Sequence, residues 1–160
     1  MIEVVAGIIY KGDKFLIAQR NLKKSQGGYW EFPGGKVEKN ETNQEALKRE
    51  IKEEFNADID VTEYVGEIIH HYPEKDVKLS FYKANLISET LELLEHEDYK
   101  WINKEEKTNY QFAGADEKCF DWIAGRRNNG WLSSRTIRLR DEENMENKES
   151  QSKRYLVMIK

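Results

Sequence analysis

The sequence is poor in cysteine, in histidine and in long apolar runs. Its single cysteine, Cys119, excludes an internal disulfide, and we interpret it as a packed helix residue rather than a nucleophile. The three histidines, His70, His71 and His96, lack the spacing of zinc ligands, and we interpret them as ordinary strand and loop residues. The chain shows neither a signal peptide nor an apolar run long enough to span a membrane. We therefore expect a cytoplasmic protein with no membrane partner.

An excess of positive charge is also missing. The 160 residues carry a formal net charge of −4, so we expect no stable complex with nucleic acid. The length suits one domain with a substantial core. A turn-rich break at Gly125–Gly130 leads us to predict a domain over residues 1–125 and a C-terminal extension over residues 126–160.

The extension is rich in arginine. We interpret it as a peripheral hairpin or a partly ordered tail. The alternative is a basic strand that contacts a polyphosphate, a partner protein or a second subunit. Residues 154–159 are strand-like. The arginines of the extension's basic stretch are Arg126, Arg127, Arg135, Arg138 and Arg140.

Three carboxylates, those of Glu50, Glu53 and Glu54, stand at positions i, i+3 and i+4. They share one face if the segment is helical. Like charges at this spacing destabilise a helix unless a cation lies between them, and Mg²⁺ prefers oxygen ligands. A solvated acidic helix face is the alternative, since 35% of the residues are charged. The surrounding residues decide between the two interpretations.

The flanking residues predict a helix that follows a glycine loop. Thr42 and Glu45 form a capping box at its start, and Asn56 tolerates the left-handed conformation that helix ends often need. Upstream, Pro33–Gly35 predicts a loop whose backbone can approach another group closely. A glycine loop followed by a helix with clustered carboxylates suits the binding of a phosphate ester together with a metal ion. The expected inward face of the helix consists of Ala46, Leu47, Ile51 and Phe55.

The full spacing resembles the Nudix box, G-x5-E-x7-R-E-U-x-E-E-x-G-U, where U is aliphatic. The last glycine of the box is here Asn56, and Ala57 stands at the final aliphatic position. The resemblance extends to the MutT-like branch of the family and covers residues 2–124. The segments that carry it are GIIY, LIAQR, YWEFPGGKVE, EHEDYKWI and FAGADEK. The matching fixed positions are Gly35, Glu41, Arg49, Glu50, Ile51, Glu53 and Glu54.

The resemblance implies an α/β fold, namely an α/β/α sandwich around a mixed β-sheet. Runs of apolar and β-branched residues predict most of its strands. Apolar residues such as Phe120 and Ile123 predict a closing helix at Ala115–Ala124. The predicted strands are Ile2–Tyr10, Phe15–Gln19, Tyr29–Pro33, Ile59–Ile69, Val77–Leu86 and Tyr99–Asn103.

The resemblance also implies a Mg²⁺ site, with Mn²⁺ as a substitute ion. Glu95 lies six residues before Trp101, where relatives carry a further carboxylate that is a metal ligand or a base. Arg49 matches an arginine that orients the acids. We favour Glu53 as the general base, with Glu50 and Glu95 as alternatives. The implied metal ligands are the Gly34 carbonyl and the carboxylates of Glu50, Glu53, Glu54 and Glu95.

Four further residues match positions that contact the nucleotide. Arg20 ends a predicted strand, and we favour a phosphate clamp over a surface ion pair. Glu31 and Phe32 match positions that line the substrate cleft. Asp116 matches the position that reads the base edge, although it could instead cap the closing helix. An ionised Asp116 suits the amine of cytosine, whereas a protonated one can donate to an oxidised purine.

The implied activity is hydrolysis of a nucleoside triphosphate to the monophosphate and pyrophosphate. The candidate substrates are modified or excess (d)NTPs such as 8-oxo-dGTP, (d)CTP and 5-methyl-dCTP. One alternative is a Nudix hydrolase on ADP-ribose, a dinucleotide polyphosphate or capped RNA. Another is a non-catalytic nucleotide-sensing module, against which the intact acids argue. We expect a monomer or a homodimer.

Overall fold

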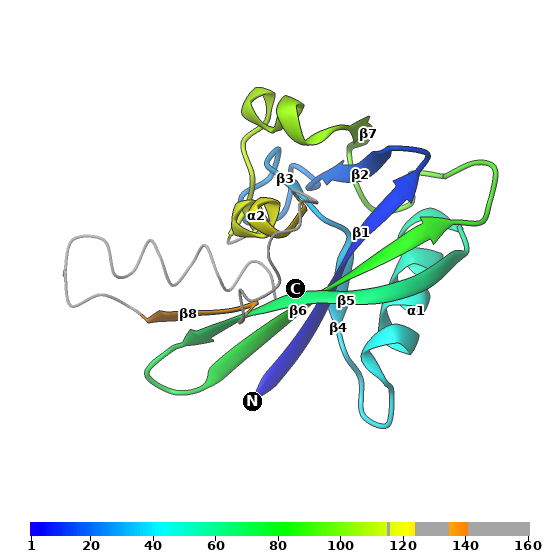
Figure 1. Cartoon of the computed structure of the whole chain (residues 1–160). Helices are drawn as coiled ribbons and strands as arrows, with labels where there is room; N and C mark the ends of the chain where they lie inside the picture. The colour runs from blue at the N-terminus through cyan, green and yellow to red at the C-terminus, as the bar shows by residue number, and fades with distance from the viewer. Residues whose placement is uncertain (115, 124–134, 141–160) are drawn as a thin grey trace.

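A mixed sheet with helices on both of its faces forms the body of the protein (Figure 1). The computed structural model describes residues 1–114, 116–123 and 135–140. Helix α1 (Asn43–Phe55) packs on one face. On the other face lie the 3₁₀ helix η2 (Asp116–Cys119) and the short helix α2 (Phe120–Ile123). The predicted α/β/α arrangement around a mixed sheet is confirmed.

The sheet has the order β3-β2-β1-β6-β5-β8, with β4 paired to β1 and β7 paired to β2. The pairs β1–β6 and β5–β8 are parallel, and the other pairs are antiparallel. Each predicted strand has a counterpart. The strands are β1 (Ile2–Lys11), β2 (Lys14–Gln19), β3 (Trp30–Glu31), β4 (Gly34–Lys36), β5 (Ile59–His71), β6 (Asp76–Leu86), β7 (Asp98–Ile102) and β8 (Thr136–Arg140).

The Pro-Gly-Gly segment differs from the prediction of a loop. Gly34–Lys36 forms strand β4, which pairs with the first half of β1. A Cβ at Gly34 would overlap the carbonyl oxygen of Val5, and a Cβ at Gly35 would overlap the carboxyl group of Glu50. The two glycines therefore let the backbone come close to Val5 and Glu50, as expected. However, this backbone belongs to a paired strand and not to a loop. This strand places the start of α1 beside β1.

Helix α1 begins and ends where the sequence predicts. The Thr42 hydroxyl accepts a hydrogen bond from the Glu45 N–H at 3.1 Å, and the Glu45 carboxylate accepts one from the Thr42 N–H at 2.9 Å. Asn56 caps the other end with φ 51° and ψ 43°, the left-handed conformation. Asparagine therefore serves where the Nudix box has glycine. The predicted inward residues are all buried, namely Ala46, Leu47, Ile51 and Phe55.

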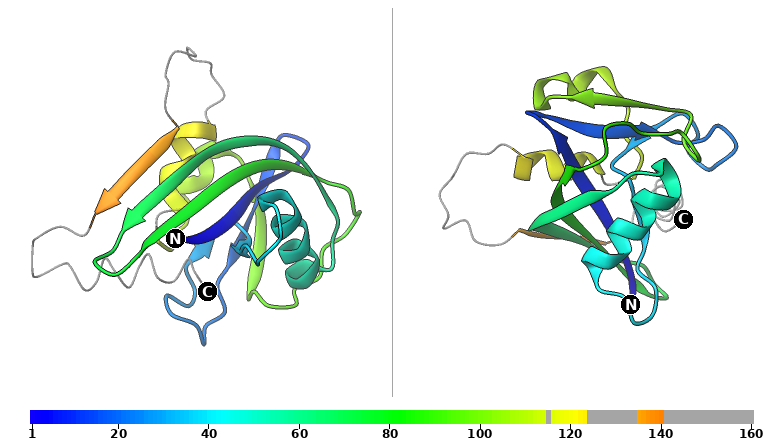
Figure 2. Two further views of the ribbon diagram at one scale, coloured as in Figure 1. Left: turned by 90° about the horizontal axis from the view of Figure 1, so that it is seen from below. Right: turned by 90° about the vertical axis from the view of Figure 1, so that its right-hand side faces the viewer.

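Alternation along β1 divides the apolar core in two. Val4 and Ile8 face η2 and α2, whereas Val5 and Ile9 face α1. Burying each such side chain contributes about 1.5–3 kcal/mol. Figure 2 shows the curved strands β5 and β6 passing over α1, with β8 at the outer edge of the sheet. The core on the α1 side packs this helix against the sheet and so fixes the position of its acids.

The segment after residue 114 agrees with some of the predictions made from the sequence. The predicted closing helix is η2 followed by α2, and Ala115 and Ala124 lie outside the described residues. Cys119 is fully buried, which fits a packed residue. Strand β8 turns Ile137 and Leu139 toward the core. The proposed boundary at residue 125 and the segments 126–134 and 141–160 lie outside the described residues, so the domain division stays a prediction. No helix among the described residues is long and apolar enough to cross a membrane.

Candidate active site

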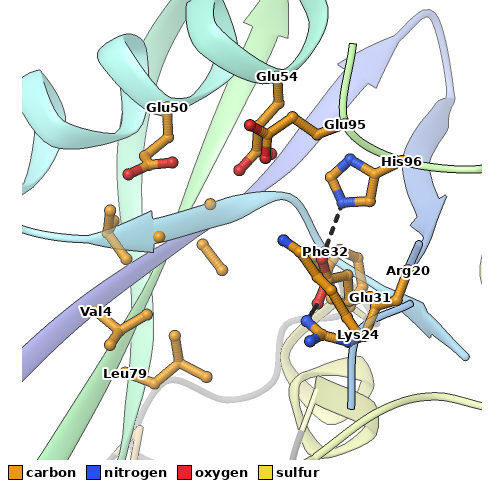
Figure 3. A pocket seen from close by; sticks show the side chains of 14 residues that line it. Val4, Arg20, Lys24, Glu31, Phe32, Glu50, Glu54, Leu79, Glu95 and His96 are labelled. Atoms are coloured by element: carbon orange, nitrogen blue, oxygen red, sulfur yellow. Dashed lines mark hydrogen bonds and ion pairs between the residues drawn. The ribbon is translucent and has the colours of Figure 1, made fainter. Parts of the chain in front are cut away.

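A pocket opens where α1, β4, the loop after β2 and the loop before β7 meet (Figure 3). Most of the site residues predicted from the sequence lie in its wall, although Arg49, Glu53 and Asp116 do not. Lys24 and His96, which the sequence analysis did not assign to the site, also line it. The predicted residues that it brings together are Arg20, Glu31, Phe32, Gly34, Glu50, Glu54 and Glu95.

The acids of α1 that enter the pocket are Glu50 and Glu54. The Glu54 side chain is only 7% exposed, and its Oε1 has no hydrogen-bond partner among the described residues. Burial raises the pKa of Glu54, and the charges of Glu31, Glu50 and Glu95 raise that pKa further. Burial also raises the pKa of Glu50, against the opposing effect of Arg49. Two crowded acids of this kind destabilise the protein unless a cation joins them.

Arg49 holds three segments of the site together. Its Nε donates to Glu41 Oε2 at 2.7 Å, its Nη1 to Glu50 Oε2 at 3.0 Å, and its Nη2 to the carbonyl of Lys36 at 3.0 Å. Hydrogen bonding to Glu41 raises the pKa of Arg49, so the guanidinium stays charged. This geometry suits the orienting role expected of Arg49.

Glu53 lies apart from Glu50 and Glu54. Its side chain is 57% exposed and lies 3.3 Å from Nη1 of Arg49. The helix face predicted for three acids is therefore split, with Glu50 and Glu54 in the pocket and Glu53 at its outer side. The metal and base roles assigned to Glu53 stay predictions.

The donor set fits a hard cation. In the described part of the chain, no three acidic, histidine or cysteine side chains form a ready-made metal cluster. However, the unpartnered Oε1 of Glu54 and the neighbouring carboxylate of Glu50 offer oxygen donors of the kind that Mg²⁺ binds. Gly35 leaves the space that the Glu50 carboxylate occupies. The residues therefore fit a divalent metal ion.

Glu31 is clamped between two basic side chains. Its Oε1 accepts from Arg20 Nη1 at 2.8 Å, and its Oε2 lies 2.9 Å from Nε2 of His96. Burial acts to raise the pKa of Glu31, but the hydrogen bond with His96 and the charge of Arg20 outweigh it and lower that pKa. The His96 ring stacks on Phe55, with centroids 5.3 Å apart. Treating His96 as an ordinary loop residue therefore missed part of the site, and its place next to Glu95 was the available signal.

Arg20 is buried rather than spread over the pocket surface. Its side chain is 3% exposed, and besides Glu31 it donates from Nε to the carbonyl of Ser25 at 3.0 Å. Its Nη2 is buried without a partner among the described residues. Arg20 therefore fixes Glu31 and the loop after β2, while direct contact with phosphate stays a prediction.

Asp116 lies behind the pocket, next to Phe32. Its Oδ2 accepts a hydrogen bond from the Phe32 N–H at 2.7 Å, so it ties η2 to the end of β3 rather than capping its own helix. Its Oδ1 has no partner among the described residues, and the residue is fully buried. Burial, followed by the negative charge of Glu31, raises the pKa of Asp116 well above its ordinary value.

Comparisons with known proteins identify the family of the chain. A sequence model of the NUDIX domain matches residues 4–122. The CTP pyrophosphohydrolase of Escherichia coli is 40% identical over 116 residues, which are 72% of this chain and 86% of that protein. The 8-oxo-dGTP diphosphatase of Proteus vulgaris is 43% identical over 82 residues, covering 51% of this chain and 73% of that protein.

Solved structures show the same fold. The solution structure of the E. coli ORF135 protein has a TM-score of 0.69 and 36% identity, and the match covers 81% of this chain and 95% of that one. The MutT protein of a methicillin-resistant Staphylococcus aureus, described as a Nudix hydrolase, has a TM-score of 0.60 and 42% identity, covering 76% of this chain and 94% of that one. The chain belongs to the Nudix family.

Proposed function

We propose that this protein is a Mg²⁺-dependent nucleoside triphosphate pyrophosphohydrolase of the MutT type. It converts a modified or excess (d)NTP to the nucleoside monophosphate and pyrophosphate. The observation that carries the proposal is the buried carboxylate of Glu54, unpartnered among the described residues and set beside Glu50 in the wall of a pocket. The relatives named for CTP and for 8-oxo-dGTP support a triphosphate as the substrate.

Glu50 and Glu54 would hold the metal ion, together with the Gly34 carbonyl, Glu53 and Glu95. Bound Mg²⁺ neutralises charge on the phosphate oxygens and makes a water molecule more acidic. Arg49 keeps Glu50 in place, because it binds that carboxylate and the carbonyl of Lys36 at once. The protein therefore supplies fixed charge and position, which is most of what phosphoryl chemistry requires.

We assign the role of general base to Glu53, with Glu50 and Glu95 as the alternatives. Glu53 is much more exposed than Glu50 and Glu54, so it can pass a proton on to solvent. Its ion pair with Arg49 ties it to the same guanidinium that holds Glu50. Accepting a proton from the attacking water is a task for a carboxylate within hydrogen-bond reach of it.

Asp116 is the proposed reader of the base. Its buried Oδ1, without a partner among the described residues, is the atom that a base edge would satisfy. The raised pKa of Asp116 favours the neutral acid, which both donates and accepts. That form suits an oxidised purine, whereas the ionised form suits the amine of cytosine. Both 8-oxo-dGTP and (d)CTP stay candidate substrates, and the substrate comparison below decides between them.

Asp116→Asn tests the protonation state of this residue. As the pH rises from about 4, the unfolded chain loses its proton first, so an acid with a raised folded pKa progressively destabilises the native protein. Asparagine keeps an acceptor for the Phe32 N–H and does not titrate. We expect the variant to be more stable by about 1–3 kcal/mol at pH 8, with a smaller gain at pH 5.

Urea unfolding at the two pH values measures the Asp116 effect. Asp121→Asn, at an exposed position of α2, is the matched control and should change stability by less than about 0.5 kcal/mol at either pH. A gain that does not grow with pH, or a loss at pH 8, would show that Asp116 is ionised in the folded protein.

A hydrolysis panel tests the proposed activity and identifies the base. It contains CTP, dCTP, 5-methyl-dCTP, dGTP, 8-oxo-dGTP, ADP-ribose and a dinucleotide polyphosphate, each with Mg²⁺, and is read for pyrophosphate against phosphate. We expect pyrophosphate from one triphosphate, and we expect Glu53→Gln to abolish it. Release of other products from ADP-ribose or a dinucleotide alone would replace the proposal with another Nudix activity.

A further inference from the structure

The pocket contains more negative than positive charge for a ligand that is itself an anion. Glu31, Glu50, Glu54 and Glu95 all line it. A triphosphate therefore needs cations besides the metal ion. Of the basic side chains in the wall, Arg20 and His96 both bind Glu31. Arg20 uses Nη1 for Glu31 and Nε for the carbonyl of Ser25, which leaves its buried Nη2 as the one group that could face a ligand.

Lys24 is the remaining cation of the wall. It comes from the loop between β2 and β3, and Figure 3 shows its side chain extending into the pocket with its nitrogen directed toward α1. Its side chain is exposed, and within the part of the chain that the structure describes its ammonium group has neither a hydrogen bond nor an ion pair. It is thus a cation that faces the metal-binding acids without being neutralised by them.

The loop that carries Lys24 is tied down at several points. The Lys24 N–H donates to the carbonyl of Asn21 at 3.0 Å, and the Lys24 carbonyl accepts from the Gly27 N–H at 3.0 Å. Arg20 binds the carbonyl of Ser25, the residue next to Lys24. Leu22 N–H donates to the carboxylate of Glu97, in the loop that follows Glu95. The backbone of Lys24 is therefore held in place, while its ammonium group stays available.

We propose that Lys24 binds the phosphate chain of the substrate and that Arg20 acts by positioning the loop that carries Lys24. The inference rests on the proposed function, because it assigns a residue to that substrate. An ammonium group binds phosphate oxygens as a point charge and needs no fixed geometry. A flexible side chain on a fixed loop meets this requirement. Because Lys24 would contact only the phosphate chain, it should not discriminate between nucleotides with different bases.

Steady-state kinetics with Mg²⁺ and the preferred triphosphate test the proposal. Lys24→Met keeps most of the side-chain length and removes the charge, so KM should rise about tenfold with kcat changed by less than about twofold. Lys24→Arg should restore KM to near the wild-type value. The rise in KM should be the same for triphosphates with different bases, in contrast to any effect of Asp116.

Lys23→Met is the matched control, because Lys23 is an adjacent exposed lysine that does not line the pocket. It should leave KM unchanged. An unchanged KM in Lys24→Met would overturn the proposal, as would an equal rise in Lys23→Met, which would indicate only general attraction by positive charge. A rise confined to one base would also overturn it.

Calorimetric binding of pyrophosphate in the presence of Mg²⁺ separates this proposal from the proposed function. Lys24→Met should bind pyrophosphate about ten times more weakly than the wild type, whether or not the protein turns a triphosphate over. Absence of turnover in the wild type would contradict the function alone. Equal pyrophosphate affinity in the wild type and in Lys24→Met would contradict the role of Lys24 alone.

Discussion

Replacing Glu54 with glutamine is expected to abolish activity and to stabilise the metal-free protein. A metal ion contributes several kcal/mol of charge stabilisation to the transition state, so losing a ligand should lower kcat at least about 10³-fold. The same change removes a buried carboxylate that has an unpartnered oxygen and lies close to like charges. Relief of about 1–3 kcal/mol should raise the Tm of the metal-free protein by about 3–8 °C.

Thermal unfolding with and without Mg²⁺ measures the expected gain in stability of Glu54→Gln, which accompanies its loss of activity. Mg²⁺ should raise the Tm of the wild type and have little effect on Glu54→Gln, because binding stabilises only a protein that has the site. Glu74→Gln, in the exposed turn between β5 and β6, removes the same charge and should change neither activity nor the Mg²⁺ response. A less stable Glu54→Gln, or one that still responds to Mg²⁺, would contradict the assignment of Glu54 as a metal ligand.

Removing Arg20 is expected to destabilise the fold strongly. Arg20→Ala removes one of the two basic partners of the half-buried Glu31 carboxylate and leaves it close to the acids of Glu54 and Asp116. Breaking a buried ion pair by removing one partner costs about 3–5 kcal/mol. The variant also loses the hydrogen bond from Arg20 to the carbonyl of Ser25, which is one of several that hold the loop after β2. Urea unfolding should show the loss in full.

A second variant separates the ion pair from simple loss of packing. Arg20→Met combined with Glu31→Leu replaces both charges with apolar groups and should recover most of the lost stability. Arg138→Ala, at an exposed position of β8, is the control and should cost less than about 0.5 kcal/mol. If the double variant is as unstable as Arg20→Ala, the ion pair is not the source of the effect.

Local signals in the sequence were sufficient to predict the elements that carry the site. The capping box of Thr42 and Glu45 marks the start of α1, and Asn56 marks its end, because both ends depend on residues a few positions apart. Runs of apolar and β-branched residues predicted β1 and β6, since they too are signals that lie within a short segment. Strand β4 was missed because its pairing with β1 joins residues about thirty positions apart, and nothing within Pro33–Gly35 indicates a partner.

The environments of the site residues were not predictable from the sequence. Spacing placed Glu50, Glu53 and Glu54 on one face, but packing against β4 and the loop before β7 leaves Glu53 outside the pocket. The burial of Arg20, its pairing with Glu31 and the contact between Glu31 and His96 all join segments distant in the chain. A spacing pattern predicts which residues act, whereas packing decides which of them are available to a ligand.

Identification of the reaction products tests the central claim most directly. Phosphorus NMR of the preferred triphosphate after incubation with the protein distinguishes cleavage at either anhydride. We predict equal amounts of nucleoside monophosphate and pyrophosphate with Mg²⁺ present, and neither product after chelation or with Glu54→Gln. Orthophosphate with a nucleoside diphosphate, or pyrophosphate release that survives both chelation and Glu54→Gln, would contradict a metal-dependent pyrophosphohydrolase.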